Sequence, residues 1–166
     1  RTFDLVEVGF LLPKAKLEIA DDCWYGGYLH TLEVTRKDDI ETHPSILLCS
    51  SNGNRVIGDL HRPTTFVRGS SKDELLTQSL NPVNTAFELA TNMISRLKQC
   101  EFEVLNDPIL QIKRCHLPAS AVAEIEKELG KSRSTRYELV CAISRYALRQ
   151  DYEVAEKYFY SAGRVF

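Results

Sequence analysis

Asn52 and Gly53 lie between two apolar runs, at 45–50 and 55–60. Asn-Gly is typical of two-residue β-hairpin turns, because both residues tolerate a positive φ angle. The pattern therefore predicts an antiparallel hairpin at this point. No other short signal in the sequence constrains the fold as strongly, because a hairpin fixes the pairing of two strands.

The rest of the first half also has strand patterns. Alternating apolar and polar residues, rich in β-branched and aromatic types, predict strands at 3–12, 14–19, 24–35 and 64–67. Pro13 is expected to separate the first two strands, because proline has no amide hydrogen to donate. The charged segment 36–43, which Pro44 follows, is expected to be a loop.

The second half is expected to be mainly helical. Asn81 and Pro82 match an N-cap and a first helical position, and apolar residues at helical spacing follow over 82–99. Short strands are expected at 102–105 and 109–115, around a turn at 106–108.

Three further helices are predicted from their end signals. The first runs from Pro118 to Gly130, which is expected to close it at the C′ position. The second follows Thr135, which forms a capping-box pattern with Glu138. The third follows Asp151 and is expected to end near Gly163.

These patterns predict an α+β fold. We expect a mostly antiparallel N-terminal sheet, packed by one long helix and followed by a C-terminal helical subregion. A chain of 166 residues is typical of one domain, so 1–166 is expected to be a single domain, β-rich over 1–68 and helix-rich over 72–166. Because it begins with Arg1, we also expect a fragment of a larger protein.

Charge and cysteine content narrow the classes of function. The chain has 21 basic and 23 acidic residues, which disfavours a dedicated duplex-DNA binder. Its five cysteines are odd in number and widely spread, which favours reduced thiols in the cytoplasm or nucleus. No apolar run approaches the length of about 18 residues needed to cross a bilayer, so no contact with a membrane is expected.

Metal and cofactor signatures are missing from the sequence. The four histidines have no ligand spacing with one another or with cysteine, and no glycine-rich phosphate loop occurs. We therefore expect neither a metal ion nor a cofactor.

An aromatic cluster is the first candidate site. Trp24, Tyr25 and Tyr28 stand close to Asp21 and Asp22. Aromatic rings can stack on a flat base while a carboxylate accepts its N–H groups. The preferred interpretation, however, is that Trp24 and Tyr28 belong to the core and that the two aspartates form a turn.

A basic cluster in the last helices is the second candidate. It resembles a helix-turn-helix only poorly, because Glu126, Arg133 and Arg136 fall where that motif needs small or apolar residues, so an ordinary αα-hairpin is preferred. The side chains could contact phosphate, or they could pair with nearby glutamates on a solvated face. The candidate residues are Lys127, Lys131, Arg133, Arg136, Arg145 and Arg149.

A possible catalytic group is the third candidate. Cys49 lies on one strand of the predicted hairpin, and Asp59 and His61 lie on or just after the other. A thiol, an imidazole and a carboxylate can form a nucleophilic site. The preferred interpretation places Asp59 and His61 on a solvent face and Cys49 in the core.

Three functions follow from these candidates. The leading hypothesis is a non-catalytic interaction module of a larger intracellular protein, whose partner is another protein or the rest of its own chain. The second is a nucleic-acid or nucleotide binder, for RNA or an RNA-cap-like group. The third is an enzyme with a site near Cys49, Asp59 and His61.

Overall fold

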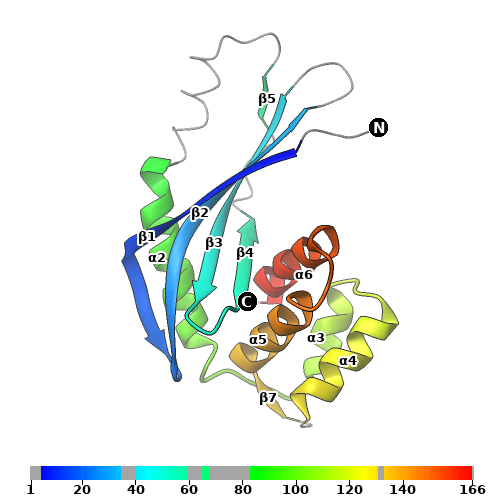
Figure 1. The fold of residues 1–166 in the computed structure, drawn as a ribbon. Coiled ribbons are helices and arrows are strands. Elements are labelled where there is room, and N and C mark those ends of the chain that lie inside the picture. Colours follow the sequence, from blue (N-terminus) through cyan, green and yellow to red (C-terminus); the bar gives the residue numbers. More distant parts are fainter. Residues whose placement is uncertain (1–4, 35–39, 60–64, 68–82, 131–132, 166) are drawn as a thin grey trace.

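The chain has an α+β fold in which an antiparallel sheet is followed by helices (Figure 1). The computed structural model describes residues 5–34, 40–59, 65–67, 83–130 and 133–165. The predicted fold class is therefore confirmed.

The sheet has the strand order β1-β2-β3-β4, and β5 pairs with the first part of β3. The predicted hairpin at Asn52-Gly53 is confirmed, since β3 pairs with β4 on either side of it. Its loop has three residues, 51–53, rather than two, and of Asn52 and Gly53 only Gly53 has a positive φ, of 86°. The strand bounds are β1 Leu5–Ile19, β2 Asp22–Val34, β3 Ile40–Ser50, β4 Arg55–Asp59 and β5 Thr65–Val67.

Two expectations about prolines were wrong. Pro13 does not divide two strands, because β1 continues through it with a register shift between Leu11 and Lys16. Among the described strands β1 pairs only with β2, and proline is tolerated at such an edge irregularity. Pro44 does not end a loop but lies within β3. It falls between the part of β3 that pairs with β4 and the part that pairs with β5, so its missing amide hydrogen costs no pairing there.

Helix α2, Val83–Gln99, lies along one face of the sheet (Figure 1), as predicted for 82–99. Its buried residues Ala90, Ile94 and Leu97 face the strands. The approach is close at Gly26, where an added Cβ would lie 2.8 Å from the Cβ of Ala90. The expected N-cap, Asn81-Pro82, lies outside the described residues.

The second half forms the C-terminal helical subregion beside β4 (Figure 1). The predicted end signals are confirmed where they are described. Gly130 closes α4 with a φ of 59°, and Thr135 and Glu138 make both hydrogen bonds of the capping box. The elements are β6 Val104–Leu105, α3 Pro108–Arg114, α4 Ala119–Leu129, β7 Ser134–Thr135, α5 Arg136–Ala147 and α6 Tyr152–Val165.

The strand expected at 109–115 was wrong, because helix α3 occupies this segment. The Asp107 carboxylate accepts a hydrogen bond of 2.9 Å from the amide of Leu110, and Pro108 takes the first helical position. Both are helix-start signals, and together they outweigh the β-branched residues that follow. The last helix also passes the expected end at Gly163 and reaches Val165.

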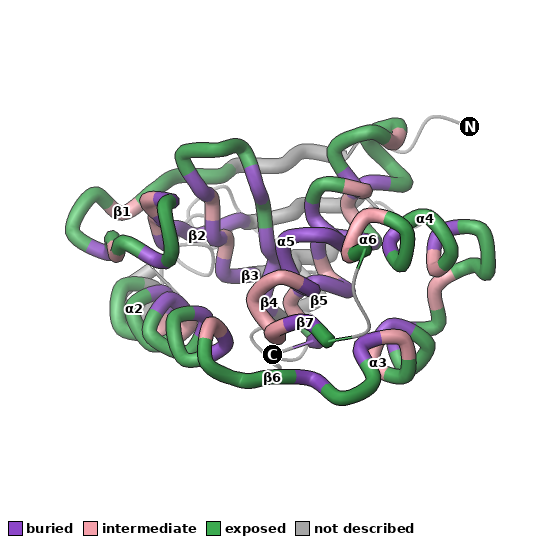
Figure 2. The backbone as a smooth tube through the Cα atoms, turned by 90° about the horizontal axis from the view of Figure 1, so that it is seen from below, coloured by how far each residue is buried: buried purple, intermediate pink, exposed green. Residues whose placement is uncertain are grey.

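The two halves of the chain share one buried cluster, which gathers where β2, β3, α5 and α6 meet (Figure 2). Helix α5 covers the outer edge of β4, where the hydroxyl of Ser144 accepts a hydrogen bond of 2.7 Å from the amide of Arg55. Helix α6 packs against the same strand, and its Gly163 lies directly on the Ile57 carbonyl. The change from the β-rich to the helix-rich part of the chain therefore does not divide the core.

Candidate functional site

The predicted aromatic cluster is divided between the two faces of the sheet. Trp24 and Tyr28 lie on the face that α2 covers and are 0% and 1% exposed, so neither ring offers a surface for a base to stack on. Tyr25 points to the opposite face and is half-buried. Asp22 is buried and accepts hydrogen bonds from Ser51 and Asn52, whereas Asp21 is exposed.

Half of the predicted basic cluster is paired within the chain, through Arg136, Arg145 and Arg149. Glu128 accepts hydrogen bonds from both Arg145 and Arg149, and Arg136 bonds to Glu103 and to the carbonyl of Val165. This pairing was the alternative to phosphate contact, and its two carboxylates offset two of the positive charges of the cluster. Lys127 and Arg133 are exposed, and Lys131 lies outside the described residues.

The predicted catalytic group is only partly described. Cys49 pairs with Arg55, and Asp59 lies four residues further along β4, which places its backbone roughly 13 Å from that pair. Burial raises the pKa of the Cys49 thiol, and the charge of Arg55 only partly offsets the effect. His61 lies outside the described residues. A raised pKa opposes the thiolate that a nucleophile requires.

The described part of the chain holds neither a metal-binding cluster nor a membrane-spanning helix. No group of three or more His, Cys, Asp or Glu side chains there is placed to hold a metal ion. None of the described helices combines the length and the apolar character needed to cross a membrane.

A cleft between the sheet and α6 is the candidate site. It lies on the face away from α2, and none of the described helices lies over β1 and β2 on that face (Figure 1). The cleft encloses about 90 Å³, well below the roughly 300–1,000 Å³ of a typical small-molecule pocket. Its size suits one side chain of a larger partner. The lining residues are Leu29, Leu47, Arg55, Ile57, Tyr152, Glu156 and Phe159.

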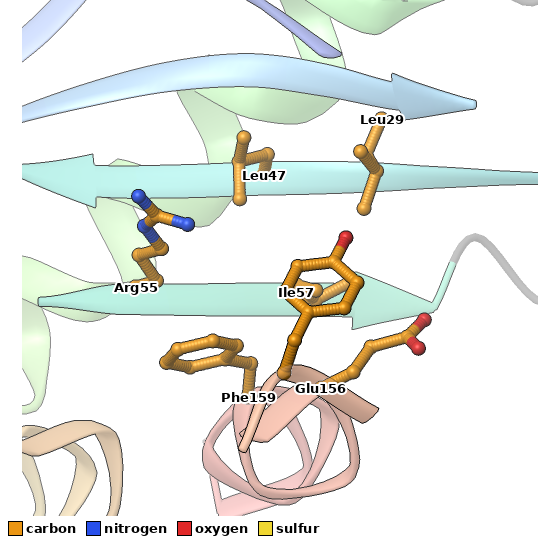
Figure 3. A pocket seen from close by; sticks show the side chains of 7 residues that line it. Leu29, Leu47, Arg55, Ile57, Glu156 and Phe159 are labelled. Atoms are coloured by element: carbon orange, nitrogen blue, oxygen red, sulfur yellow. The ribbon is translucent and has the colours of Figure 1, made fainter. Parts of the chain in front are cut away.

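The cleft has an apolar floor with opposite charges at its ends. Leu47 and Ile57 from the sheet form the floor with Phe159 from α6, and Arg55 and Glu156 lie toward opposite ends (Figure 3). Within the described residues, neither Arg55 nor Glu156 makes a hydrogen bond or an ion pair through its side chain. A partner with complementary charges around an apolar group would satisfy both.

These residues were not predicted as a site from the sequence. The structure places Arg55 opposite Cys49 and Ile57 opposite Leu47. A two-residue turn at Asn52-Gly53 would have shifted this pairing by one residue and reversed the faces of the strand, so the sheet side of the cleft was not predictable from that signal. The helix side was not predictable either, because α6 reaches the sheet from about 100 residues further along the chain and no local pattern encodes that contact.

By its fold and its site, the chain is an α+β protein with a partly uncovered sheet face and a small apolar cleft. Comparison of the sequence and structure with protein-family models, curated proteins and solved structures gave no significant match.

Proposed function

We propose that this chain is a non-catalytic interaction module of a larger intracellular protein, and that the cleft between β4 and α6 holds one apolar side chain of a protein partner. The observation that carries the proposal is the combination of an apolar floor, a volume of about 90 Å³ and a charge at each end that has no ion-pair partner among the described residues. Burying one Leu- or Phe-sized side chain contributes roughly 1.5–3 kcal/mol, which is part of the binding free energy of a weak complex.

The intracellular location is supported by the cysteines. All five are free thiols, and three of them are buried. Secreted domains of this size usually pair their cysteines in disulfides. A reducing compartment is therefore part of the proposal.

The other two hypotheses have less support. Nucleic-acid binding by the helical subregion is weakened because Glu128 pairs with both Arg145 and Arg149 and offsets one of their two positive charges. Catalysis at Cys49 is weakened because burial raises the pKa of its thiol.

A selection from a phage-displayed library of random 12-residue peptides tests the proposal. We expect the selected peptides to share one apolar residue. They should bind at least about ten-fold more weakly to a Leu47→Lys variant, which places an ammonium group on the cleft floor. Leu47 is only half-buried, and the aliphatic stem of lysine can cover the same floor, so the fold is expected to persist.

Val154→Lys is the matched control. Val154 is exposed on α6 and does not line the cleft, so the same charge is added beside the site without entering it. Peptides that bind both variants equally well would place the interaction elsewhere, and a selection that enriches no peptide would contradict the proposal.

A further inference from the structure

Four residues form a row across the uncovered sheet face. Lys16 of β1 pairs with Tyr25 of β2, Tyr25 pairs with Cys49 of β3, and Cys49 pairs with Arg55 of β4. Directly opposed residues of antiparallel strands lie on the same face. Gly26, the neighbour of Tyr25, faces α2, so the row faces away from that helix.

The ends of the row are positively charged. Lys16 and Arg55 are both exposed, and within the described residues neither side chain makes an ion pair. Three strand spacings separate them, which amounts to about 14 Å between their backbones. Between them lie the half-buried side chains of Tyr25 and Cys49. Arg55 also lines the cleft, so the row and the cleft are continuous.

We propose that the row and the cleft form one track for an extended acidic peptide segment. This inference rests on the proposed function and names the partner of the same site. One carboxylate of the segment pairs with Lys16 and a second pairs with Arg55, while the apolar residue that follows enters the cleft. An extended chain advances about 3.3–3.4 Å per residue, so the two acidic residues are about four positions apart.

The chemistry of the track favours a peptide over a single-stranded nucleic acid. The cleft floor offers Leu47, Ile57 and Phe159, which cannot satisfy the polar edge of a base. Two carboxylates also stand beside the track. Glu18 is two residues from Lys16 on the same strand, and Glu156 lies at the far end of the cleft. They would repel a continuous phosphate backbone, whereas an apolar side chain can lie beside Glu156.

The peptides selected against the chain test this inference. We expect them to carry two Asp or Glu residues about four positions apart, with an apolar residue after the second. For a labelled peptide of this kind, Lys16→Glu and Arg55→Glu should each weaken binding on the order of five-fold or more at low salt, measured by fluorescence anisotropy. Lys113→Glu is the matched control, because Lys113 is exposed on α3 and lies outside the track.

A footprint on Cys49 locates the bound peptide. Cys49 lies inside the row, so a saturating peptide should slow its alkylation, measured by mass spectrometry of the digested protein. The buried Cys141 serves as the internal reference. An unchanged rate at Cys49 would overturn the inference.

The outcomes separate this inference from the proposed function. The selected peptides could share an apolar residue, lack the acidic pair and bind Lys16→Glu as they bind the wild type. That result would overturn the proposed track but would leave the proposed cleft site in place. A selection that enriches no peptide overturns both. A labelled 20-nucleotide oligouridylate gives the third outcome. If it binds the wild type but not Lys16→Glu or Arg55→Glu, the ligand of the track is a nucleic acid and not an acidic peptide.

Discussion

The indole Nε1 of Trp24 donates a hydrogen bond of 2.9 Å to the hydroxyl of Tyr137, a residue 113 positions further along the chain. The two rings also meet edge to face, with their centroids 6.2 Å apart. Trp24 is on β2 and Tyr137 is on α5, so this pair joins the sheet to the helical subregion. Tyr137 contributes both the acceptor for a buried donor and part of the packing around it.

Tyr137→Phe removes the acceptor and keeps the ring. The buried indole N–H is then left without its partner, and we expect the free energy of unfolding to fall by about 1–3 kcal/mol. Urea denaturation followed by Trp24 fluorescence measures the change. Tyr152→Phe is the control, because Tyr152 is 61% exposed. Equal stability of the two variants would contradict the importance of this bond.

Gly163→Ala tests the contact between α6 and β4. In a solvent-exposed helix this change usually stabilises by about 0.5–1 kcal/mol. Here the new methyl group would overlap the carbonyl oxygen of Ile57, so we expect destabilisation by about 1–3 kcal/mol. Urea denaturation measures the change, and the sign of the shift in the midpoint distinguishes the two effects. A stabilised variant would show that α6 does not lie directly on the strand.

Asp22 is expected to make stability depend on pH. Burial alone would raise the pKa of its carboxyl, but hydrogen bonds from Ser50, Ser51 and the amides of Asn52 and Cys23 outweigh burial and lower it below 3.8. A pKa lowered by folding stabilises the protein above the unfolded-state pKa, and this contribution is lost as pH falls through the folded-state pKa.

The Asp22→Asn variant should therefore be about 1–3 kcal/mol less stable than the wild type at pH 6. The difference should shrink as pH falls below about 4. Urea titrations at several pH values measure it. Asp21→Asn removes the same charge from the exposed neighbouring residue and should change stability little. A difference for Asp22→Asn that stays constant with pH would contradict the prediction.

The cysteines should differ in their rates of alkylation. Burial raises the pKa values of Cys100 and Cys141 to about 11, from an ordinary value of 9.0, which lowers their thiolate fractions by about a hundred-fold at neutral pH. Both should react with iodoacetamide far more slowly than the half-buried Cys23, as followed by mass spectrometry. Equal rates are expected in urea. Fast reaction of Cys49 in the folded protein would instead support the enzyme hypothesis.

Local chemistry explains which parts of the fold were predictable. The turn at Asn52-Gly53, the capping box of Thr135 and Glu138 and the helix end at Gly130 each depend on a few neighbouring residues. The α3 helix has comparable signals in Asp107 and Pro108, but they were interpreted as a turn because the next residues are β-branched or apolar. The path of β1 through Pro13 was not predictable locally, because it depends on β1 lying at the sheet edge.

The candidate site was harder to predict from the sequence than the fold was. Tyr25 was singled out beside Trp24, but alternation alone does not say which face of the strand α2 covers. Arg55 was not selected as a site residue, because the residues next to it in the sequence do not indicate whether its side chain has an ion-pair partner. Its exposure and its place in the cleft follow from the docking of α5 and α6, which is a property of the whole chain.

The hydrogen bond between Ser144 and the amide of Arg55 also has a consequence for folding during synthesis, because β4 is made before the helix that contacts its edge. Its two partners are 89 residues apart, and synthesis at about 5–20 residues per second separates them by roughly 4–18 s. During this interval the nascent sheet has emerged with the outer strand β4 still lacking its cover. Unpaired strand edges associate readily with other chains, so slow or interrupted translation between the two residues should increase aggregation of the newborn protein.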